Sequence, residues 1–244
     1  MGFTLDPWQD GVLAARKRRI ILNCTRQGGK TEVSGLKVLH TAITHPGATC
    51  LLYSPSLRQS GELFRRVLGP YRNVEGDNPA KRETILHIEL ENGSRVIALP
   101  GKESTTRTYA ADLVVVDEAA RVPDAVFIGL RPMLAVTQGA LILLSTPGGE
   151  FGHFAGIWTE GDPEVWHKVR ITAPMLPGIT LSPPEPDGVC PRIPIEFLEQ
   201  ERREMPHDAF MSEYYGEFMP SESSAFSYAA IEAAMSSDVE PWVL

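Results

Sequence analysis

The 244-residue chain is long enough for one sizeable α/β domain, or for such a domain with a small appendage. Its hydrophobic fraction of 43% and charged fraction of 22% are those of an ordinary globular protein. The formal net charge of −8 argues against a surface that is basic all over, but it leaves room for a local basic face. No apolar run approaches the roughly 20 residues that span a bilayer, and the polar, acidic start does not have the pattern of a secretory signal.

The apolar runs of the first 150 residues predict alternating strands and helices. In chain order, strands are expected at 18–24, 48–54, 84–90, 94–100, 112–117 and 140–146, and helices are expected to begin at Lys30, Ser56 and Pro123. An Asn-Gly turn at 92–93 predicts that the strands on either side of it form an antiparallel hairpin. The other strands are uniformly apolar, which indicates a mostly parallel sheet flanked by helices, an α/β fold.

The sequence changes character after residue 150. A helix and a strand are predicted within 151–172, and seven prolines between 174 and 194 indicate a loop or linker. Two helical segments and a Ser- and Ala-rich tail follow. We therefore divide the chain into a core at 1–150 and a small C-terminal subdomain at 151–244.

The short basic runs predict solvated surface, and the isolated cysteines predict free thiols. The basic run at 15–19 and the pairs Arg65-Arg66 and Lys81-Arg82 are typical of a solvated surface. Three cysteines lie far apart without metal-site spacing, so we expect free thiols in a reducing cytosol: Cys24, Cys50 and Cys190.

The segment "CTRQGGKT" follows the first predicted strand and opens the first long helix. Phosphate-binding loops direct backbone N–H groups at the anion from a helix N-terminus, and Gly28 and Gly29 permit the close approach. Lys30 is expected to contact the β- and γ-phosphates, and Thr31 is expected to bind Mg²⁺. Cys24 stands where the usual pattern has glycine, so a basic turn after a strand remains the alternative at this point.

Two carboxylates end the most apolar strand, in "LVVVDEAA". Acidic groups at the tip of a buried strand are costly unless a cation or water uses them. In nucleotide hydrolysis the first, Asp117, would hold the Mg²⁺ shell and the second, Glu118, would polarise the attacking water. A strand end that simply emerges into solvent is the alternative.

Four further residues are candidates with simpler alternatives. Ser145 and Thr146 end a strand and are predicted to sense the γ-phosphate, although Ser-Thr-Pro-Gly-Gly is also a good turn sequence. Gln9 in "LDPWQ" is placed to read the edge of adenine. Arg107 in a polar loop is predicted to stabilise γ-phosphate charge, in its own subunit or in a neighbour, and a solvated loop arginine is the alternative.

These segments in this order resemble the ATPase domain of the large terminase subunit, the DNA-packaging motor of tailed phages. "LDPWQ" resembles its adenine-reading segment, "CTRQGGKTE" its deviant Walker A motif, "VVVDEAA" its Walker B motif and "LLSTPGG" its coupling motif. The resemblance covers residues 5–150, and "EYYGEF" near the C-terminus is similar to a segment of the family's lid. The family implies a RecA-like P-loop NTPase of the ASCE type with a lid after residue 150.

The resemblance also implies roles for individual residues. It makes Arg26 a nucleotide-sensing residue and Arg107 an arginine finger acting in trans. Nucleotide-binding positions then comprise Gln9, Thr25, Gln27, Gly28, Gly29, Lys30, Thr31 and Glu32, with ATP and Mg²⁺ as cofactors. Apart from the resemblance, a DNA translocase needs cations for the phosphate backbone, and we expect contacts with double-stranded DNA from four basic side chains: Arg65, Arg66, Arg72 and Arg95.

The implied function is ATP-driven translocation of viral DNA into a procapsid in the cytoplasm of an infected bacterium. The implied partners are the portal protein, the small terminase subunit and further copies of the chain in a ring, with a monomer expected in isolation. Family members continue into a nuclease domain near where this sequence ends, so no nuclease activity is expected of this segment. A helicase-type ATPase and a nucleotide-binding module without turnover remain as alternatives.

Overall fold

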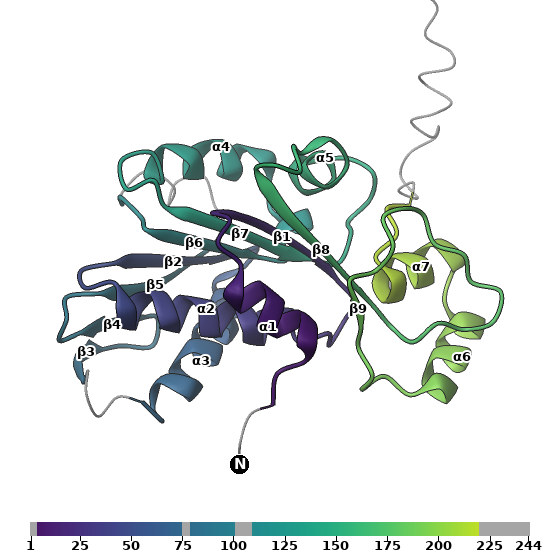
Figure 1. The fold of residues 1–244 in the computed structure, drawn as a ribbon, viewed down its shortest axis with the longest axis horizontal. Coiled ribbons are helices and arrows are strands. Elements are labelled where there is room, and N and C mark those ends of the chain that lie inside the picture. Colours follow the sequence, from purple (N-terminus) through teal and green to yellow (C-terminus); the bar gives the residue numbers. More distant parts are fainter. Residues whose placement is uncertain (1–3, 75–78, 101–108, 220–244) are drawn as a thin grey trace, which may run out of the picture.

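Nine strands form one sheet in the computed structural model, which describes residues 4–74, 79–100 and 109–219 (Figure 1). The strand order is β3-β4-β5-β2-β6-β7-β1-β8-β9, and every pairing from β5 to β9 is parallel, whereas β3 and β4 are antiparallel additions at one edge. The strands are β1 (Arg19–Cys24), β2 (Thr49–Ser54), β3 (Ala80–Glu83), β4 (His87–Leu90), β5 (Arg95–Pro100), β6 (Leu113–Asp117), β7 (Ala140–Ser145), β8 (Trp166–Thr172) and β9 (Gly188–Val189). The predicted α/β class with a mostly parallel sheet is confirmed.

Helices cover both faces of this sheet. One layer holds α1 (Pro7–Ala14), α2 (Lys30–Thr44) and α3 (Leu57–Tyr71), and the opposite layer holds α4 (Asp124–Met133) and α5 (His153–Glu160) (Figure 1). Strand β6 shows why the strands are apolar throughout. Leu113 and Val115 pack into the core under α2 and α3, whereas Val114 and Val116 pack under α4, so both faces of the strand are buried.

Local chemistry sets several element boundaries as predicted. Helix α3 begins after Ser56, whose hydroxyl accepts a hydrogen bond from the Gln59 backbone N–H at 3.3 Å. Strands β4 and β5 form the antiparallel hairpin around the Asn-Gly turn, where Gly93 has φ of 82°. Two elements were not predicted from the sequence: α1, which has Pro7 in its first turn, and β3, whose Ala-Lys-Arg-Glu sequence carries no apolar alternation.

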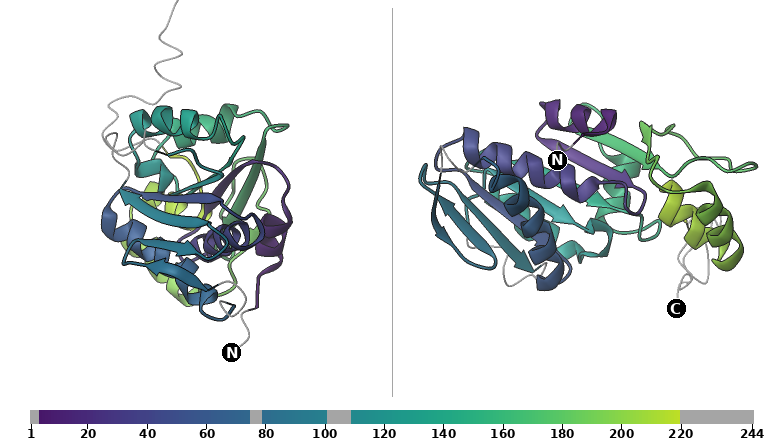
Figure 2. Two further views of the ribbon diagram at one scale, coloured as in Figure 1. Left: turned by 90° about the vertical axis from the view of Figure 1, so that its left-hand side faces the viewer. Right: turned by 90° about the horizontal axis from the view of Figure 1, so that it is seen from below.

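The sheet continues past residue 150. Strand β8 pairs in parallel with β1 along its length, and the proline-rich segment that follows adds only β9 at the edge. Helices α6 (Ile195–Glu204) and α7 (His207–Tyr215) lie beside the sheet, at the end of the molecule where β1 and β8 finish (Figure 2). The division of the chain at residue 150 stays a prediction.

Buried Arg170 on β8 fastens these C-terminal segments to the sheet. Its guanidinium donates to the carbonyl of Ser182 at 2.6 Å, to the carbonyl of Tyr215 at 2.8 Å and to the Glu217 carboxylate at 2.7 Å. Because each N–H of a buried cation needs an acceptor, the proline-rich loop and the end of α7 are held in fixed positions. Within the part of the chain that the structure describes, no helix combines the length and apolarity needed to cross a membrane.

Candidate nucleotide-binding site

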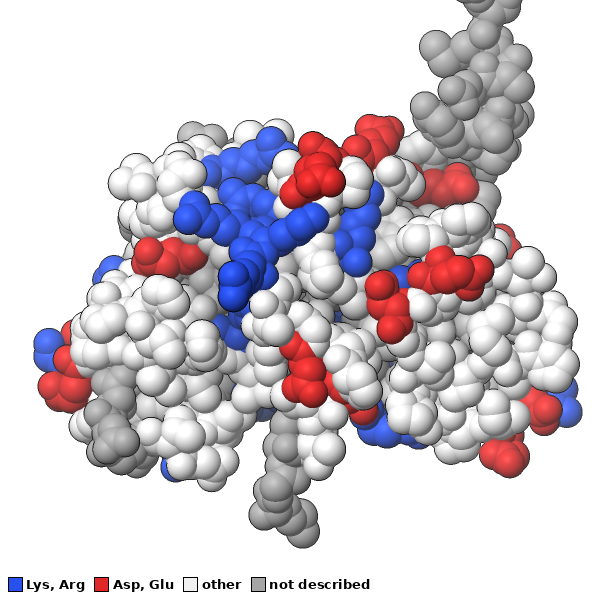
Figure 3. Space-filling model, in the orientation of Figure 1, with Lys and Arg blue, Asp and Glu red and all other residues white. Residues whose placement is uncertain are grey.

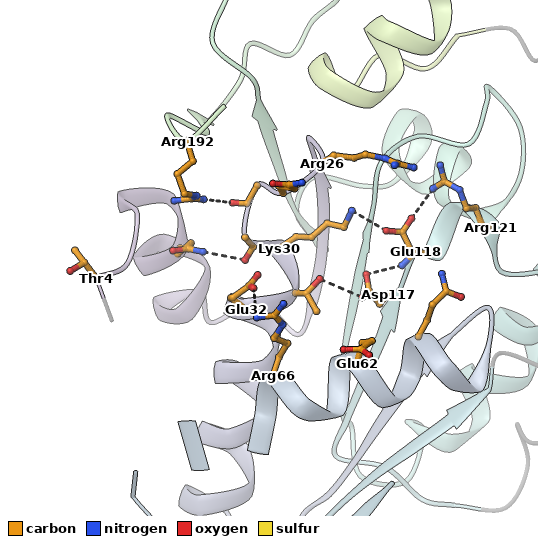
Figure 4. Close-up of a pocket in the computed structure, with 16 residues that line it drawn as sticks. Thr4, Arg26, Lys30, Glu32, Glu62, Arg66, Asp117, Glu118, Arg121 and Arg192 are labelled. Atoms are coloured by element: carbon orange, nitrogen blue, oxygen red, sulfur yellow. Dashed lines mark hydrogen bonds and ion pairs between the residues drawn. The ribbon is translucent and has the colours of Figure 1, made fainter. Parts of the chain in front are cut away.

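A cavity of about 980 Å³ opens beyond the carboxyl ends of β1 and β6, where ligands of parallel sheets bind (Figure 4). It is lined by residues of the N-terminal segment and α1, the loop after β1, α2, α3, the end of β6 with the turn after it, and the proline-rich loop: Thr4, Gln9, Arg26, Gln27, Gly28, Gly29, Lys30, Thr31, Glu32, Gln59, Glu62, Arg66, Asp117, Glu118, Arg121 and Arg192. The cavity therefore brings together eight of the site residues predicted between Gln9 and Glu32. It also includes the two predicted carboxylates, Asp117 and Glu118.

The loop between β1 and α2 has the backbone of an anion-binding turn. Gly29 caps α2 with φ of 93°, a left-handed conformation that favours glycine, and a Cβ there would lie 2.6 Å from the side-chain amide of Gln9, which would have to move. Gln27 has φ of 55°, an uncommon conformation for a residue with a side chain. Cys24 is fully buried at the end of β1, and burial raises the pKa of its thiol to about 12. The position that usually holds glycine is thus filled by a small, neutral packing residue.

Lys30 and the two carboxylates after β6 converge on the cavity. The Lys30 ammonium lies 3.2 Å from Glu118 Oε1, and the Thr31 hydroxyl donates to Asp117 Oδ2 at 3.4 Å (Figure 4). Glu118 has φ of 50°, so the chain is turned sharply there, and Asp117 Oδ1 accepts a hydrogen bond from the Glu118 N–H at 2.9 Å. A residue other than glycine is strained in the left-handed backbone conformation. Two such residues, Gln27 and Glu118, line the same cavity.

Asp117 and Thr31 have the chemistry of a Mg²⁺ site. Asp117 is only 8% exposed, and burial, assisted by the nearby Glu118 charge, raises its pKa to about 6. A carboxylate and a hydroxyl are hard oxygen ligands, and Mg²⁺ commonly takes one or two such ligands and completes its shell with water and phosphate. No cluster of three His, Cys, Asp or Glu side chains able to hold a metal alone occurs among residues 4–74, 79–100 and 109–219. The two residues present fit a metal that arrives with a nucleotide.

Arg121 connects the site to two other parts of the fold and was not predicted. Its guanidinium donates to Glu118 Oε2 at 2.7 Å, to the Thr146 hydroxyl at 3.2 Å and to Glu213 of α7 at 3.2 Å. Together with Lys30, it places a cation on each oxygen of the Glu118 carboxylate. Its position three residues after Glu118 is the sequence signal that could have identified it, since such residues meet on one turn.

Helix α7 contacts the phosphate-binding loop through Glu213. The carboxylate accepts a hydrogen bond from Arg26 Nε at 2.7 Å, and the Glu213 carbonyl accepts the Arg26 N–H at 3.1 Å and the Thr25 hydroxyl at 3.3 Å. The hydrogen bond to the Glu213 carboxylate, together with its negative charge, raises the pKa of the Arg26 guanidinium. Asn23 adds a bond from its amide to the carbonyl of Gly216 at 2.7 Å. The end of β1, the loop and α7 therefore form one hydrogen-bonded unit.

The opposite rim of the cavity is held by α1 and the proline-rich loop. Gln9 donates from Nε2 to the Gly29 carbonyl at 3.1 Å and accepts the Asp6 N–H at 2.9 Å. Arg192 bonds the Gly28 carbonyl at 2.9 Å and the Asp6 carboxylate at 2.7 Å. Arg192 was not predicted, because nothing in the sequence connects a loop arginine to a glycine 164 positions earlier. The adenine-reading role of Gln9 stays a prediction.

Ser145 and Thr146 lie behind the cavity rather than in its lining. Both are buried, and the Ser145 hydroxyl makes no hydrogen bond within the described part of the chain. Thr146 reaches the site through Arg121. The predicted coupling role stays a prediction, with Arg121 as the physical connection.

No family model matches this sequence. A curated relative, the large terminase subunit of Thermus phage G20c, is 24% identical over 258 aligned residues that cover 93% of this chain and 51% of that protein. The solved ATPase domain of the large terminase of Thermus phage P74-26 superposes with a TM-score of 0.71 at 19% identity, covering 89% of this chain and 95% of that one. The large terminase of the thermophilic bacteriophage D6E, solved in complex with ADP, superposes with a TM-score of 0.65 at 15% identity and covers 88% of this chain and 54% of that one.

This chain has the fold of a large terminase ATPase domain. The resemblance inferred from four short motifs is thereby confirmed. The chain spans about half the length of the large terminase subunit of phage G20c.

The roles predicted for Arg107 and for the DNA-binding arginines stay predictions. Arg107 lies outside the described residues. Of the arginines assigned to DNA, Arg65 pairs with Glu62, Arg72 with Glu83 at 2.7 Å, and Arg66 with Glu32 at 3.1 Å on the cavity rim. Arg95 donates to the Thr49 hydroxyl at 2.9 Å. Glu32 is therefore a partner of Arg66 as well as a lining residue.

Proposed function

We propose that this chain is a Mg²⁺-dependent ATPase that drives the translocation of double-stranded viral DNA into a procapsid. The observation that carries the proposal is the convergence of Lys30, Thr31, Asp117 and Glu118 around one cavity behind a loop capped by Gly29. These are the groups that phosphoryl transfer to water requires: a phosphate cradle, a metal position and a base.

The loop and the start of α2 would bind the triphosphate. The backbone N–H groups at the N-terminus of α2 carry partial positive charge, and Lys30 adds a full charge that is 7% exposed and therefore little screened. Thr31 and Asp117 would hold Mg²⁺, which supplies charge neutralisation at the β- and γ-phosphates when bound. Protonation of Asp117 near pH 6 would weaken that hold.

Glu118 would orient and deprotonate the attacking water. In the structure each of its oxygens is paired, with Lys30 on one side and Arg121 on the other. A γ-phosphate competes for Lys30 because phosphate carries more charge than a carboxylate, and the competition would free Oε1 to accept a water proton. Glu118 is thus held inactive until nucleotide enters.

Helix α7 would receive the signal that the γ-phosphate has left. Arg26 and Arg121 both contact the phosphate side of the cavity and both bond Glu213, so movement of either guanidinium changes how α7 is held. We propose that Arg107 acts in trans within a ring of copies attached to the portal protein, with the small subunit delivering DNA, in the cytoplasm of the infected bacterium.

The Glu118→Gln variant tests the proposal. The amide keeps the shape but cannot take a proton, so ATP turnover should fall by roughly 10²–10⁴-fold while nucleotide affinity stays within a few-fold. The assay measures phosphate release at several protein concentrations with and without duplex DNA, because a finger supplied in trans would make turnover concentration-dependent.

The matched control is Glu199→Gln, at an exposed position on α6 away from the cavity. It should hydrolyse ATP at the wild-type rate. Undiminished turnover by Glu118→Gln would refute the assigned base. ATP binding without turnover in the wild type under every condition would favour the nucleotide-binding module instead.

A further inference from the structure

Basic side chains gather at the end of the sheet opposite the nucleotide site (Figure 3). They come from the connection between α1 and β1, the start of β1, the last turn of α4 and the middle of β8: Arg16, Lys17, Arg18, Arg19, Arg131 and Lys168. We call these six residues the basic face. They form a positive surface on a chain whose formal net charge is −8, so the charge of this protein is strongly asymmetric.

None of the six makes an ion pair with any residue that the structure describes. The contacts that hold them use neutral acceptors instead. Arg19 donates to the Gly139 carbonyl at 2.8 Å, Lys168 to the Trp158 carbonyl at 2.6 Å, and Lys17 to the Pro163 carbonyl. Carbonyl oxygens position a cation without neutralising its charge, so these cations stay available to an anionic partner.

Unlike the basic face, most of the arginines predicted from sequence to bind DNA are already in ion pairs. Arg65, Arg66 and Arg72 each pair with a carboxylate, so their charges are partly cancelled before any partner arrives. The pairing of Arg72 and of Arg66 could not be judged from sequence, because Glu83 is 11 positions from Arg72 and Glu32 is 34 positions from Arg66.

The positive charges of the basic face repel one another when no partner is bound. The pKa of Arg19 is lowered by burial and then by the charges of Arg131 and Arg18. Acidic residues of the α5–β8 connection flank the face without pairing to it; the Asp162 carboxylate accepts the N–H of Glu164 instead. An anionic partner would relieve this repulsion, and that relief adds to the attraction.

We propose that the basic face is a docking surface for the phosphate backbone of duplex DNA. Duplex DNA presents about one negative charge per 1.7 Å of its axis, so a face of several unpaired cations can contact several phosphates at once. Contacts with phosphates carry no sequence information, as a motor that moves any sequence requires. The surface also lies at the amino end of β1, whose carboxyl end leads into the phosphate-binding loop, so one strand of roughly 17–20 Å connects DNA to nucleotide. The inference rests on the proposed function for the identity of the polyanion.

The test compares two triple variants that remove equal charge. The first is Arg16→Gln, Lys17→Gln and Arg18→Gln on the exposed connection. The control is Lys81→Gln, Arg82→Gln and Arg203→Gln, three exposed cations outside the basic face that have no assigned role in DNA binding. The binding of the full chain to a fluorescent duplex is measured by anisotropy between about 50 and 200 mM KCl, since the salt slope counts phosphate contacts. Arg131→Gln, on a different element, tests the same face if the triple variant does not fold.

Loss of three contacts lowers the slope of log K against log salt by about 2.7, because each contact contributes about 0.9. Wild-type affinity should therefore fall about 40-fold more than that of the basic-face variant over this fourfold range of salt. Arg131→Gln should lower the slope by about 0.9, and the control should match the wild type.

Three outcomes would overturn the proposal: an unchanged slope in both basic-face variants, a loss confined to the control variant, or poly-glutamate competing as well as duplex at equal charge, which would indicate an acidic protein partner. Binding of a fluorescent ATP analogue is measured on the same samples. A wild-type chain that binds duplex through this face but neither binds nor hydrolyses ATP would refute the proposed function and leave the docking surface standing.

Discussion

Replacing Glu213 by glutamine removes the negative charge that α7 places between two guanidinium groups of the nucleotide site. The Glu213 carboxylate lies 2.7 Å from Arg26 Nε and 3.2 Å from Arg121 Nη2, and its side chain is 17% exposed. The glutamine amide can accept from one arginine through its oxygen, but its NH₂ group then faces the other arginine, donor against donor. The backbone bonds from the Glu213 carbonyl to the loop are unchanged.

The loss can be estimated from these contacts. A hydrogen bond to a charged group contributes about 1.5–3 kcal/mol when buried, and an exposed ion pair about 0.2–1 kcal/mol. The Arg26 side chain is 65% exposed and the Arg121 side chain 38%, so the estimate for the two contacts together is nearer the lower range, about 1–2 kcal/mol. A change of this size increases the population of a locally opened α7 by about 5- to 30-fold.

Amide hydrogen exchange measures this opening directly. In the nucleotide-free Glu213→Gln chain, exchange of the amides in α7 should accelerate by that factor, while the amides of β6 and β7 stay protected. Glu196→Gln on the exposed face of α6 is the matched control and should change neither. If the α7 amides of the variant exchange at the wild-type rate, or if exchange accelerates evenly over the whole sheet, Glu213 does not hold α7 at the site.

Two further perturbations probe the loop and the metal position. Burial that raises the Asp117 pKa to about 6 favours the neutral acid in the fold, so the free energy of unfolding should fall by up to about 3 kcal/mol as pH rises from about 4 to about 6. Asp117→Asn should flatten this part of the profile in chemical denaturation, and identical profiles for the two chains would contradict the assignment. Gly29→Ala places a methyl group 2.6 Å from the Gln9 amide at φ of 93° and should destabilise the chain by about 1–3 kcal/mol with loss of nucleotide binding. Gly11→Ala on α1 meets no atom within 4 Å and should instead raise the melting temperature, so similar effects of both substitutions would refute the steric argument.

Much of the core could be predicted because its determinants are local. The apolar runs of β1, β2, β6 and β7 have the composition of strands buried on both faces, and α2 and α3 begin where a glycine-rich turn and a capping serine stand. Because parallel sheets bind ligands at the carboxyl ends of their strands, the sequence also predicts that Lys30 and Glu118 lie at one site. Strand β3 and helix α1 were not predicted, because contacts with neighbouring elements stabilise them and their own sequences lack a hydrophobic periodicity.

The sequence by itself determined which residues could bind a phosphate and a metal, since a P-loop and an acidic strand end are patterns of adjacent residues. Only the tertiary structure decided which charges are already neutralised. Arg121 and Arg26 meet through Glu213, and Arg192 reaches Gly28, across separations that no periodicity encodes. Whether a cation meets a carboxylate or a carbonyl depends on how helices pack and which strands pair, so the paired state of Arg72 and the unpaired state of the basic face became visible only in the fold.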